Sequence, residues 1–153
     1  MTRTVPACAG TRDAGATATA GPNFAWILAT RALRRLDDLD LSAMRVALNG
    51  AEPVDADAME ALVEAGARHG LEPGAIFPAF GMAEVCIAGA FPEPGAGLRI
   101  DAVDGRVLET EHYAAPATDP GSAGVRRLAR LGRPIDGLEM RVVDPESGAV
   151  RRE

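Results

Sequence analysis

Two stretches of the chain carry apolar residues at helical spacing. The first covers residues 23–36 and predicts a helix with one buried face and Asn23 as its N-cap. The second begins after Asp55, a capping residue, and ends at Gly70. Its shared apolar face consists of Met59, Leu62, Val63 and Gly66. In its last turn, His69 is expected to be a cation at the negative end of the helix dipole and no more.

Short apolar runs between and after these helices predict strands. Residues 44–49 and 75–80 are expected to be strands that each end in a turn, and residues 85–91 a further apolar strand. Weaker runs predict a smaller β unit at residues 98–102, 125–131, 138–143 and 149–152. Residues 144–148 have the composition of a hairpin turn. Residues 104–123 are expected to be irregular and polar.

These elements predict an α/β fold, a partial sandwich of helices on a β-sheet followed by a small β unit. Residues 1–20 are rich in Thr, Ala and Gly without an apolar period, so we expect a disordered tail there. Residues 21–97 are expected to form the α/β subdomain, and residues 98–153 a polar loop and the start of the β subdomain. At 153 residues the chain is one domain or a piece of a larger one.

Composition excludes several classes of function. A net charge of −6 argues against a nucleic-acid partner, because contact with phosphates needs a basic face. No apolar run approaches the roughly 18 residues of a membrane span, so we expect no transmembrane segment and a cytoplasmic location. Cys8 and Cys86 lie far apart without metal-binding spacing, which is typical of reduced thiols.

The basic residues give a sharper constraint. All 16 are arginine, and the chain contains no lysine. Arginine cannot replace lysine where a compact ammonium must reach a transferring phosphoryl or acyl group. A mechanism that needs a catalytic lysine therefore cannot be completed within these residues.

The chemistry of the chain is concentrated in two short motifs. Phe80-Gly81-Met82-Ala83-Glu84 offers a flat ring, a closely approachable backbone and a carboxylate, the parts needed to hold a purine and a divalent cation. About 30 positions earlier, residues 49–54 read Asn-Gly-Ala-Glu-Pro-Val. This sequence predicts a strand that runs into a turn, where backbone groups can meet the edge of a planar ligand.

In this order and spacing, the motifs resemble those of the acyl-adenylate-forming ligases, especially the fatty-acyl-AMP and fatty-acyl-CoA ligase branch. The resemblance extends over about residues 21–153 and rests on residues 22–25, 40–42, 45–54, 80–84, 132–134 and 142–145. It implies a central fragment of the large N-terminal domain of a two-step enzyme. Such an enzyme converts fatty acid and ATP to acyl-AMP, with Mg²⁺, and passes the acyl group to a thiol of coenzyme A or an acyl carrier protein.

The resemblance also implies roles for individual residues. The implied nucleotide-binding residues are Gly50, Ala51, Glu52, Phe80, Gly81, Met82 and Ala83. Among them, Phe80 would stack on the adenine ring. Glu84 would hold Mg²⁺ against the phosphates, and Phe24 and Trp26 would lie beside the acyl pocket. Many members of the superfamily have a hydroxyl residue where this chain has Ala83, and the fatty-acyl-AMP branch often has Ala there.

Several of these residues also have a plain structural interpretation. Phe80 and Trp26 could simply pack in a core. Glu52 could be a solvated turn residue, and Glu84 could merely favour a helix N-terminus. The pair His112-Tyr113 is expected to lie in a surface loop, since no second catalytic partner is near it in sequence.

The family's phosphate-binding loop, rich in Ser, Thr and Gly and ending in Pro-Lys, does not occur in this sequence. In family order, the aspartate that grips the ribose and the small domain that carries the lysine follow after Glu153. We therefore expect half a nucleotide site, inactive alone. Two alternatives remain, a non-catalytic nucleotide-binding or interaction module with the same fold, and an unrelated small α/β protein.

Overall fold

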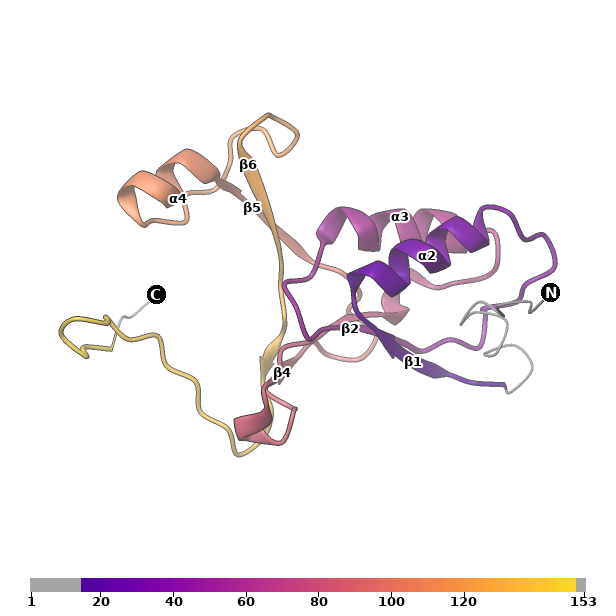
Figure 1. The fold of residues 1–153 in the computed structure, drawn as a ribbon, viewed down its shortest axis with the longest axis horizontal. Coiled ribbons are helices and arrows are strands. Elements are labelled where there is room, and N and C mark those ends of the chain that lie inside the picture. The colour runs from indigo at the N-terminus through magenta and orange to yellow at the C-terminus, as the bar shows by residue number, and fades with distance from the viewer. Residues whose placement is uncertain (1–14, 151–153) are drawn as a thin grey trace.

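A three-stranded parallel sheet carries two helices in the first half of the chain (Figure 1). The computed structural model describes residues 15–150. The strands lie in the order β1 (Ala18–Gly21), β2 (Val46–Asn49) and β3 (Ile76–Pro78). Helix α2 (Asn23–Leu33) joins β1 to β2, and helix α3 (Ala56–Ala67) joins β2 to β3. Both crossovers step the same way across the sheet, and with one handedness this places both helices on the same face, as Figure 1 shows.

The hydrophobic core lies between these two helices and the sheet. Helix α2 buries Trp26, Ala29, Thr30 and Leu33, which follow the i, i+3, i+4, i+7 spacing of one helix face. Helix α3 is capped by Asp55, whose carboxylate accepts a hydrogen bond from the backbone N of Ala58 at 3.0 Å. Its buried residues include Met59 and Leu62, and Ile76 of β3 is fully buried beneath them. The helices predicted from apolar spacing are therefore confirmed.

The second half of the chain is built from antiparallel pairs and short helical turns. The 3₁₀ turn η2 (Ala83–Val85) follows β3, whereas the other 3₁₀ turn, η1 (Pro73–Ala75), precedes β3 in the first half. Strand β4 (Ala90–Phe91) pairs with β7 (Arg133–Pro134), and β5 (Ile100–Asp104) pairs with β6 (Val125–Ala129). Helix α4 (Gly105–Glu111) follows β5, and Figure 1 shows it at the far end of the β5–β6 ribbon. The predicted α/β class, helices on a sheet followed by a small β unit, is confirmed.

An ion-pair cluster fastens this ribbon to the helical layer. Arg127 of β6 binds Glu60 of α3 at 2.7 Å and also pairs with Asp57. The hydrogen bond to Glu60 raises the pKa of the Arg127 guanidinium above its ordinary value, and the charges of Glu60 and Asp57 add to that effect. The ribbon thus has a defined contact with α3.

Strand β1 differs from the sequence prediction, because Ala18 to Ala20 were expected in the tail. The strand pairs in parallel with β2, from Ala18 opposite Val46 to Gly21 opposite Asn49. Its small residues carry no apolar pattern, and the backbone ladder to β2 forms the strand. The predicted tail residues 1–14 lie outside the described residues.

Three further predictions for the second half are corrected by the structure. Residues 85–91 contain only the two-residue strand β4, because the chain first makes turn η2. Residues 104–123 are not irregular throughout, since Asp104 caps α4 by accepting a hydrogen bond from the backbone N of Val107 at 3.0 Å. Residues 138–143 form no strand. In the described part of the chain, only an isolated bridge joins Val143 to Val150 across the predicted hairpin turn.

His69 is a buried structural residue, which corrects the expectation of a helix-end site and no more. It is 4% exposed, and its two ring nitrogens face backbone carbonyl oxygens. Nε2 lies 2.9 Å from the oxygen of Leu33, and Nδ1 lies 3.2 Å from that of Leu39. The ring therefore joins the end of α3 to the end of α2 and to the loop that follows it. His112 and Tyr113, by contrast, are exposed after α4, as predicted.

Candidate functional site

An open cavity of about 670 Å³ lies where the chain leaves the three parallel strands. Gly21 and Pro22 follow β1, Gly50 and Ala51 follow β2, and residues 79–83 follow β3. Because parallel strands present their carboxyl ends at one edge of the sheet, these segments meet there. Segments distant in the sequence thus form one cavity at the edge where α/β proteins bind ligands.

The cavity contains most of the residues singled out by the motifs. Its lining includes Gly50, Ala51, Phe80, Gly81, Met82 and Ala83. Of the predicted nucleotide-binding residues, only Glu52 is absent from the lining. Sequence reasoning missed the contributions of Cys86, Ile87 and Ala88, which it had assigned to a strand.

The lining is suited to a flat, uncharged group. None of the residues that line the cavity carries a charge. Phe80 is 37% exposed, and its ring packs against Gly89, where a Cβ atom would lie only 2.8 Å from the ring. A phenyl ring supported from behind and open in front can stack on a planar heterocycle. The cavity therefore favours the base of a nucleotide over its phosphates.

The turn after Phe80 is tightly folded and strained. A Cβ atom on Gly81 would lie 1.5 Å from the carbonyl oxygen of Ile87, so only glycine fits. Cys86 and Ile87 have φ angles of 53° and 77°, unusual for residues with a side chain and most of all for a β-branched one. The backbone N of Ile87 donates to the oxygen of Met82 at 2.9 Å and closes the turn. Strain of this kind is concentrated at binding sites.

Glu84 lies in this turn, between Ala83 and Cys86, which both line the cavity. It is exposed, and within residues 15–150 no hydrogen bond or ion pair engages its carboxylate. The same residues contain no cluster of three metal-binding side chains. A lone carboxylate nevertheless suits Mg²⁺, which uses one or two carboxylates and the oxygens of phosphates. The metal-binding role of Glu84 stays a prediction.

Asn23 and Glu52 join the start of α2 to the loop after β2. Helix α2 begins after Pro22, which makes no side-chain cap, so Asn23 is not the N-cap that its position suggested. Instead, the backbone N of Asn23 donates to Oε1 of Glu52 at 2.8 Å. The Glu52 carboxylate therefore contacts the first residue of α2 and is more than a solvated turn residue.

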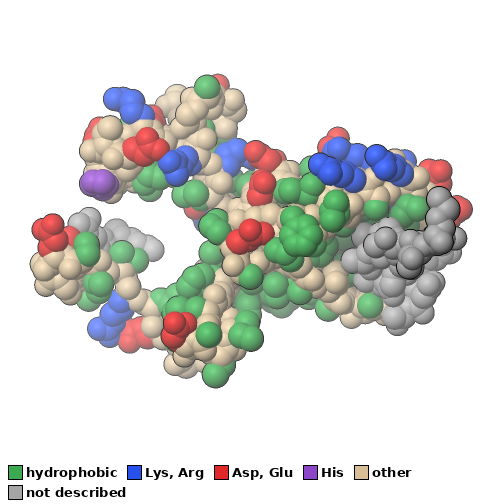
Figure 2. All heavy atoms as spheres, viewed as in Figure 1, with side chains coloured by type: hydrophobic (Ala, Val, Ile, Leu, Met, Phe, Trp, Pro, Cys, Tyr) green, Lys and Arg blue, Asp and Glu red, His purple; other side chains and the backbone are tan. Residues whose placement is uncertain are grey.

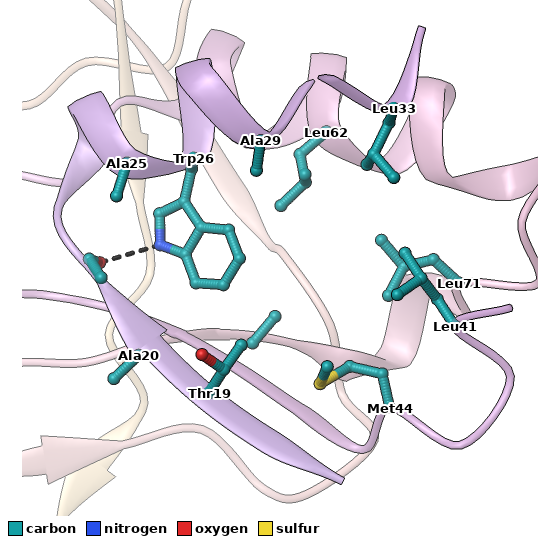
Figure 3. A pocket seen from close by; sticks show the side chains of 12 residues that line it. Thr19, Ala20, Ala25, Trp26, Ala29, Leu33, Leu41, Met44, Leu62 and Leu71 are labelled. Carbon is teal, nitrogen blue, oxygen red and sulfur yellow. Dashed lines mark hydrogen bonds between the residues drawn. The ribbon is translucent and has the colours of Figure 1, made fainter. Parts of the chain in front are cut away.

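The two aromatic residues of α2 point in different directions. Figure 3 shows the Trp26 ring between α2 and the sheet, beside an apolar space of about 50 Å³ lined by core residues. Its Nε1 donates to the oxygen of Gly21 at 2.8 Å. Phe24 is 64% exposed. These positions support a packing role for Trp26, and a place for either residue in an acyl pocket stays a prediction.

Comparison with known proteins gives close relatives. No protein-family model matches the chain. It is 47% identical over 133 residues to "Putative ligase Rv1013" of Mycobacterium tuberculosis, a match that covers 85% of this chain and 24% of that protein. It is 31% identical over 128 residues to the medium-chain-fatty-acid–[acyl-carrier-protein] ligase JamA of Moorena producens, covering 82% of this chain and 22% of that protein.

A solved structure gives the same result for the fold. The fatty acyl-adenylate ligase of Legionella pneumophila, in complex with acyl adenylate and pyrophosphate, matches with a TM-score of 0.79 and 29% identity. The match covers 90% of this chain and 24% of that one. The chain thus spans about a quarter of the length of these proteins.

The parallel sheet, the cavity at its edge and these likenesses define an α/β segment with the fold found in the adenylate-forming ligases. The chain belongs to the acyl-adenylate-forming ligase superfamily, in the branch of the fatty-acyl-AMP and fatty-acyl-CoA ligases.

Proposed function

We propose that the chain supplies the adenine-binding part of a fatty-acid adenylating ligase. The complete enzyme would join a fatty acid to the α-phosphate of ATP, releasing pyrophosphate, and then transfer the acyl group to a thiol of coenzyme A or of an acyl carrier protein. Mg²⁺ would neutralise phosphate charge during the first reaction. A cytoplasmic location stays a prediction, and within residues 15–150 no helix is both long and apolar enough to cross a bilayer.

The observation that carries this proposal is the composition of the cavity. It combines an open phenyl ring with the backbone of the segments that follow the three parallel strands, and it has no charged lining residue. Adenine is flat and uncharged and has hydrogen-bonding groups on its edge, so it matches such a surface. Free phosphate or a fatty-acid carboxylate would find no cation there. Phe80 would provide the stacking surface, and Gly50 and Ala51 would approach the edge of the base.

The absence of lysine limits the chemistry that the chain can perform by itself. Stabilising charge on the phosphorus in the transition state requires preorganised cations and donors, and the chain contains no lysine. We therefore expect the 153-residue chain not to form acyl-adenylate. It would bind the base and position Glu84, while other parts of a ligase supply the groups that contact the phosphates.

The test is a measurement of fatty-acid-dependent pyrophosphate exchange on two proteins. The first is the purified chain, for which we expect no exchange. The second is the Legionella pneumophila ligase with its matching segment replaced by residues 21–150, for which we expect activity that depends on Phe80 and Glu84. Exchange by the isolated chain, or a folded chimera whose activity is unchanged by Phe80→Ala and Glu84→Gln, would contradict the proposal. A folded but inactive chimera would favour the non-catalytic module.

A further inference from the structure

We propose that Asn23 is a positioning residue that holds the loop after β2 in the shape needed for binding the base. Its side chain does not line the cavity. It acts through Gly50 and Ala51, which do. The ligand in this inference rests on the proposed function, whereas the hold on the loop is a property of the chain alone.

The contacts of Asn23 surround the loop on both sides. Its Oδ1 accepts hydrogen bonds from Nδ2 of Asn49 at 2.8 Å and from the backbone N of Asp55 at 2.9 Å. Its Nδ2 donates to the carbonyl oxygen of Pro53 at 2.8 Å. Asn49 precedes Gly50, and the other two partners follow Ala51. A single amide group, which is both donor and acceptor, therefore fixes both ends of the loop.

Asn49 shows that this network is built into the core. The side chain is 0% exposed, and a buried amide is unfavourable unless it is hydrogen-bonded. Its Nδ2 reaches Asn23 and also lies 2.8 Å from Sδ of Met59, while its Oδ1 has no partner among the described residues. An apolar side chain would avoid that unmet acceptor. The bond to Asn23 accounts for an amide at this position.

The loop requires such a hold because its backbone is unusual. Ala51 has a φ of 70°, in the left-handed region that residues with a side chain rarely adopt. Residues 51–53 are exposed, so little packing keeps them in place. A residue in such a conformation persists only when its surroundings determine it. Among the described residues, the hydrogen bonds that Asn23 makes to Asn49, Pro53 and Asp55, together with its bond to Glu52, hold the loop in this conformation.

Glu52 also helps to hold the loop after β2. Its carboxylate accepts from the backbone N of Asn23, at the positive end of the α2 dipole, and the residue is absent from the cavity lining. The resemblance implied that Glu52 borders the base. The geometry assigns it to the anchoring of the loop, where a side chain that accepts one hydrogen bond is sufficient.

The experiment compares Asn23→Ala, Glu52→Ala and Glu52→Gln in the 153-residue chain. Thr30→Ala is the matched control, because the Thr30 hydroxyl is buried on the same helix and, among residues 15–150, bonds only to the oxygen of Trp26, at 2.8 Å. The first readout is hydrogen exchange of the Asp55 amide. The second is the affinity for lauroyl-sulfamoyl adenosine, an unreactive analogue of an acyl-adenylate.

We expect Asn23→Ala to speed exchange at Asp55 by about tenfold, the effect of losing one hydrogen bond, and to weaken binding of the analogue by a similar factor. Glu52→Ala should weaken binding, and Glu52→Gln should weaken it less, because its amide oxygen still accepts the hydrogen bond but carries no charge for the α2 dipole. Thr30→Ala should change neither readout, even if it lowers the melting temperature. If Asn23→Ala does not fold, Glu52→Ala, which alters an exposed side chain, carries the test.

An unchanged exchange rate of the Asp55 amide in Asn23→Ala would overturn the proposal, regardless of the affinity measured for the analogue. Faster exchange with unchanged affinity would also overturn it, since Asn23 would then be merely structural. Equal losses in Glu52→Gln and Glu52→Ala would show that the hydrogen bond accepted from Asn23 contributes nothing, and would refute the assignment of Glu52 to anchoring. If the unchanged chain does not bind the analogue, the proposed function fails, and the exchange result still decides whether Asn23 holds the loop.

Discussion

Replacing Gly81 by alanine should deform the turn that forms one wall of the cavity. The added Cβ atom would lie 1.5 Å from the carbonyl oxygen of Ile87. Carbon and carbonyl oxygen atoms approach to about 3.3 Å in close contacts, so the two segments must separate by roughly 2 Å. Because the obstacle is backbone, no rotation of a side chain can relieve it.

The separation removes identifiable interactions. It breaks the bond from the backbone N of Ile87 to the oxygen of Met82 and disturbs those from Gly89 and Ala90 to the oxygen of Phe80. Each is worth about 0.5–1.5 kcal/mol net, so we expect a loss of about 1–3 kcal/mol in the free energy of unfolding. For a chain of this size, that corresponds to a fall in melting temperature of roughly 2–10 °C.

The assay combines thermal unfolding with titration of lauroyl-sulfamoyl adenosine. Gly121→Ala is the matched control, since a Cβ atom there would meet only Oδ1 of Asp119, at an ordinary 3.6 Å. We expect Gly81→Ala to lose binding by about tenfold or more, because Phe80 and Met82 move with the turn, and Gly121→Ala to bind normally. Normal binding and stability in Gly81→Ala would refute the close approach on which this reasoning depends.

Three other changes test the core and the remaining site residue. Leu33→Ala removes a fully buried side chain and should lower the free energy of unfolding by about 2–5 kcal/mol in chemical denaturation. Leu28→Ala, at a 53% exposed position, should change it by no more than about 0.5 kcal/mol. Equal effects of the two changes would contradict the packing of α2. His69→Ala removes the buried ring that lies against the carbonyl oxygens of Leu33 and Leu39 and should cost about 2–4 kcal/mol. An unchanged melting temperature would make His69 the simple helix-end residue that the sequence suggested. Glu84→Gln should leave stability within about 0.5 kcal/mol but lower adenylation by the active chimera about 100-fold; full activity with a lowered melting temperature would make Glu84 structural.

The sequence predicted the elements whose stability depends on local patterns, such as an apolar helix face or a capping side chain. Helix α3 has an apolar face and a capping residue, Asp55, whose bond to Ala58 the structure contains. Strand β1 has no such signal, because Ala and Thr alternate without a buried face. It forms through the ladder to β2, a partner more than 20 residues away. Pairing energy of that kind cannot be read from a local window.

The candidate site likewise contains residues that local patterns predicted correctly and one residue, Asn23, that they did not. The motifs identified the loops that line the cavity, because glycine and aromatic residues at turns have local meaning. The helical spacing predicted Asn23 as an N-cap, because an Asn at the start of a helix is typical of that role. Its side-chain amide instead bonds to residues 26 to 32 positions later. Local rules predict a local partner for such a side chain. Only the fold brings the distant partners within reach.

Figure 2 shows apolar side chains reaching the surface across the middle of the molecule. Phe80, Met82 and Ile87, which line the cavity, are large exposed apolar residues. A second open space, lined by Arg99 and Arg133 among others, lies beside β4 and β7. The two differ in chemistry, because the first has no charged lining residue and the second is lined by three arginines and Glu93. They are therefore the natural alternatives for a nucleotide-like ligand, through its base or through its phosphates.

Mapping the binding of lauroyl-sulfamoyl adenosine on the amide NMR spectrum of the chain tests the central claim most directly. We predict that the largest shifts fall on Gly50, Ala51 and residues 80–84, and that residues of α4 and β6 do not respond. Shifts centred on Arg99 and Arg133, or no shift up to the solubility limit of the analogue, would contradict the assignment of this cavity to the adenine base.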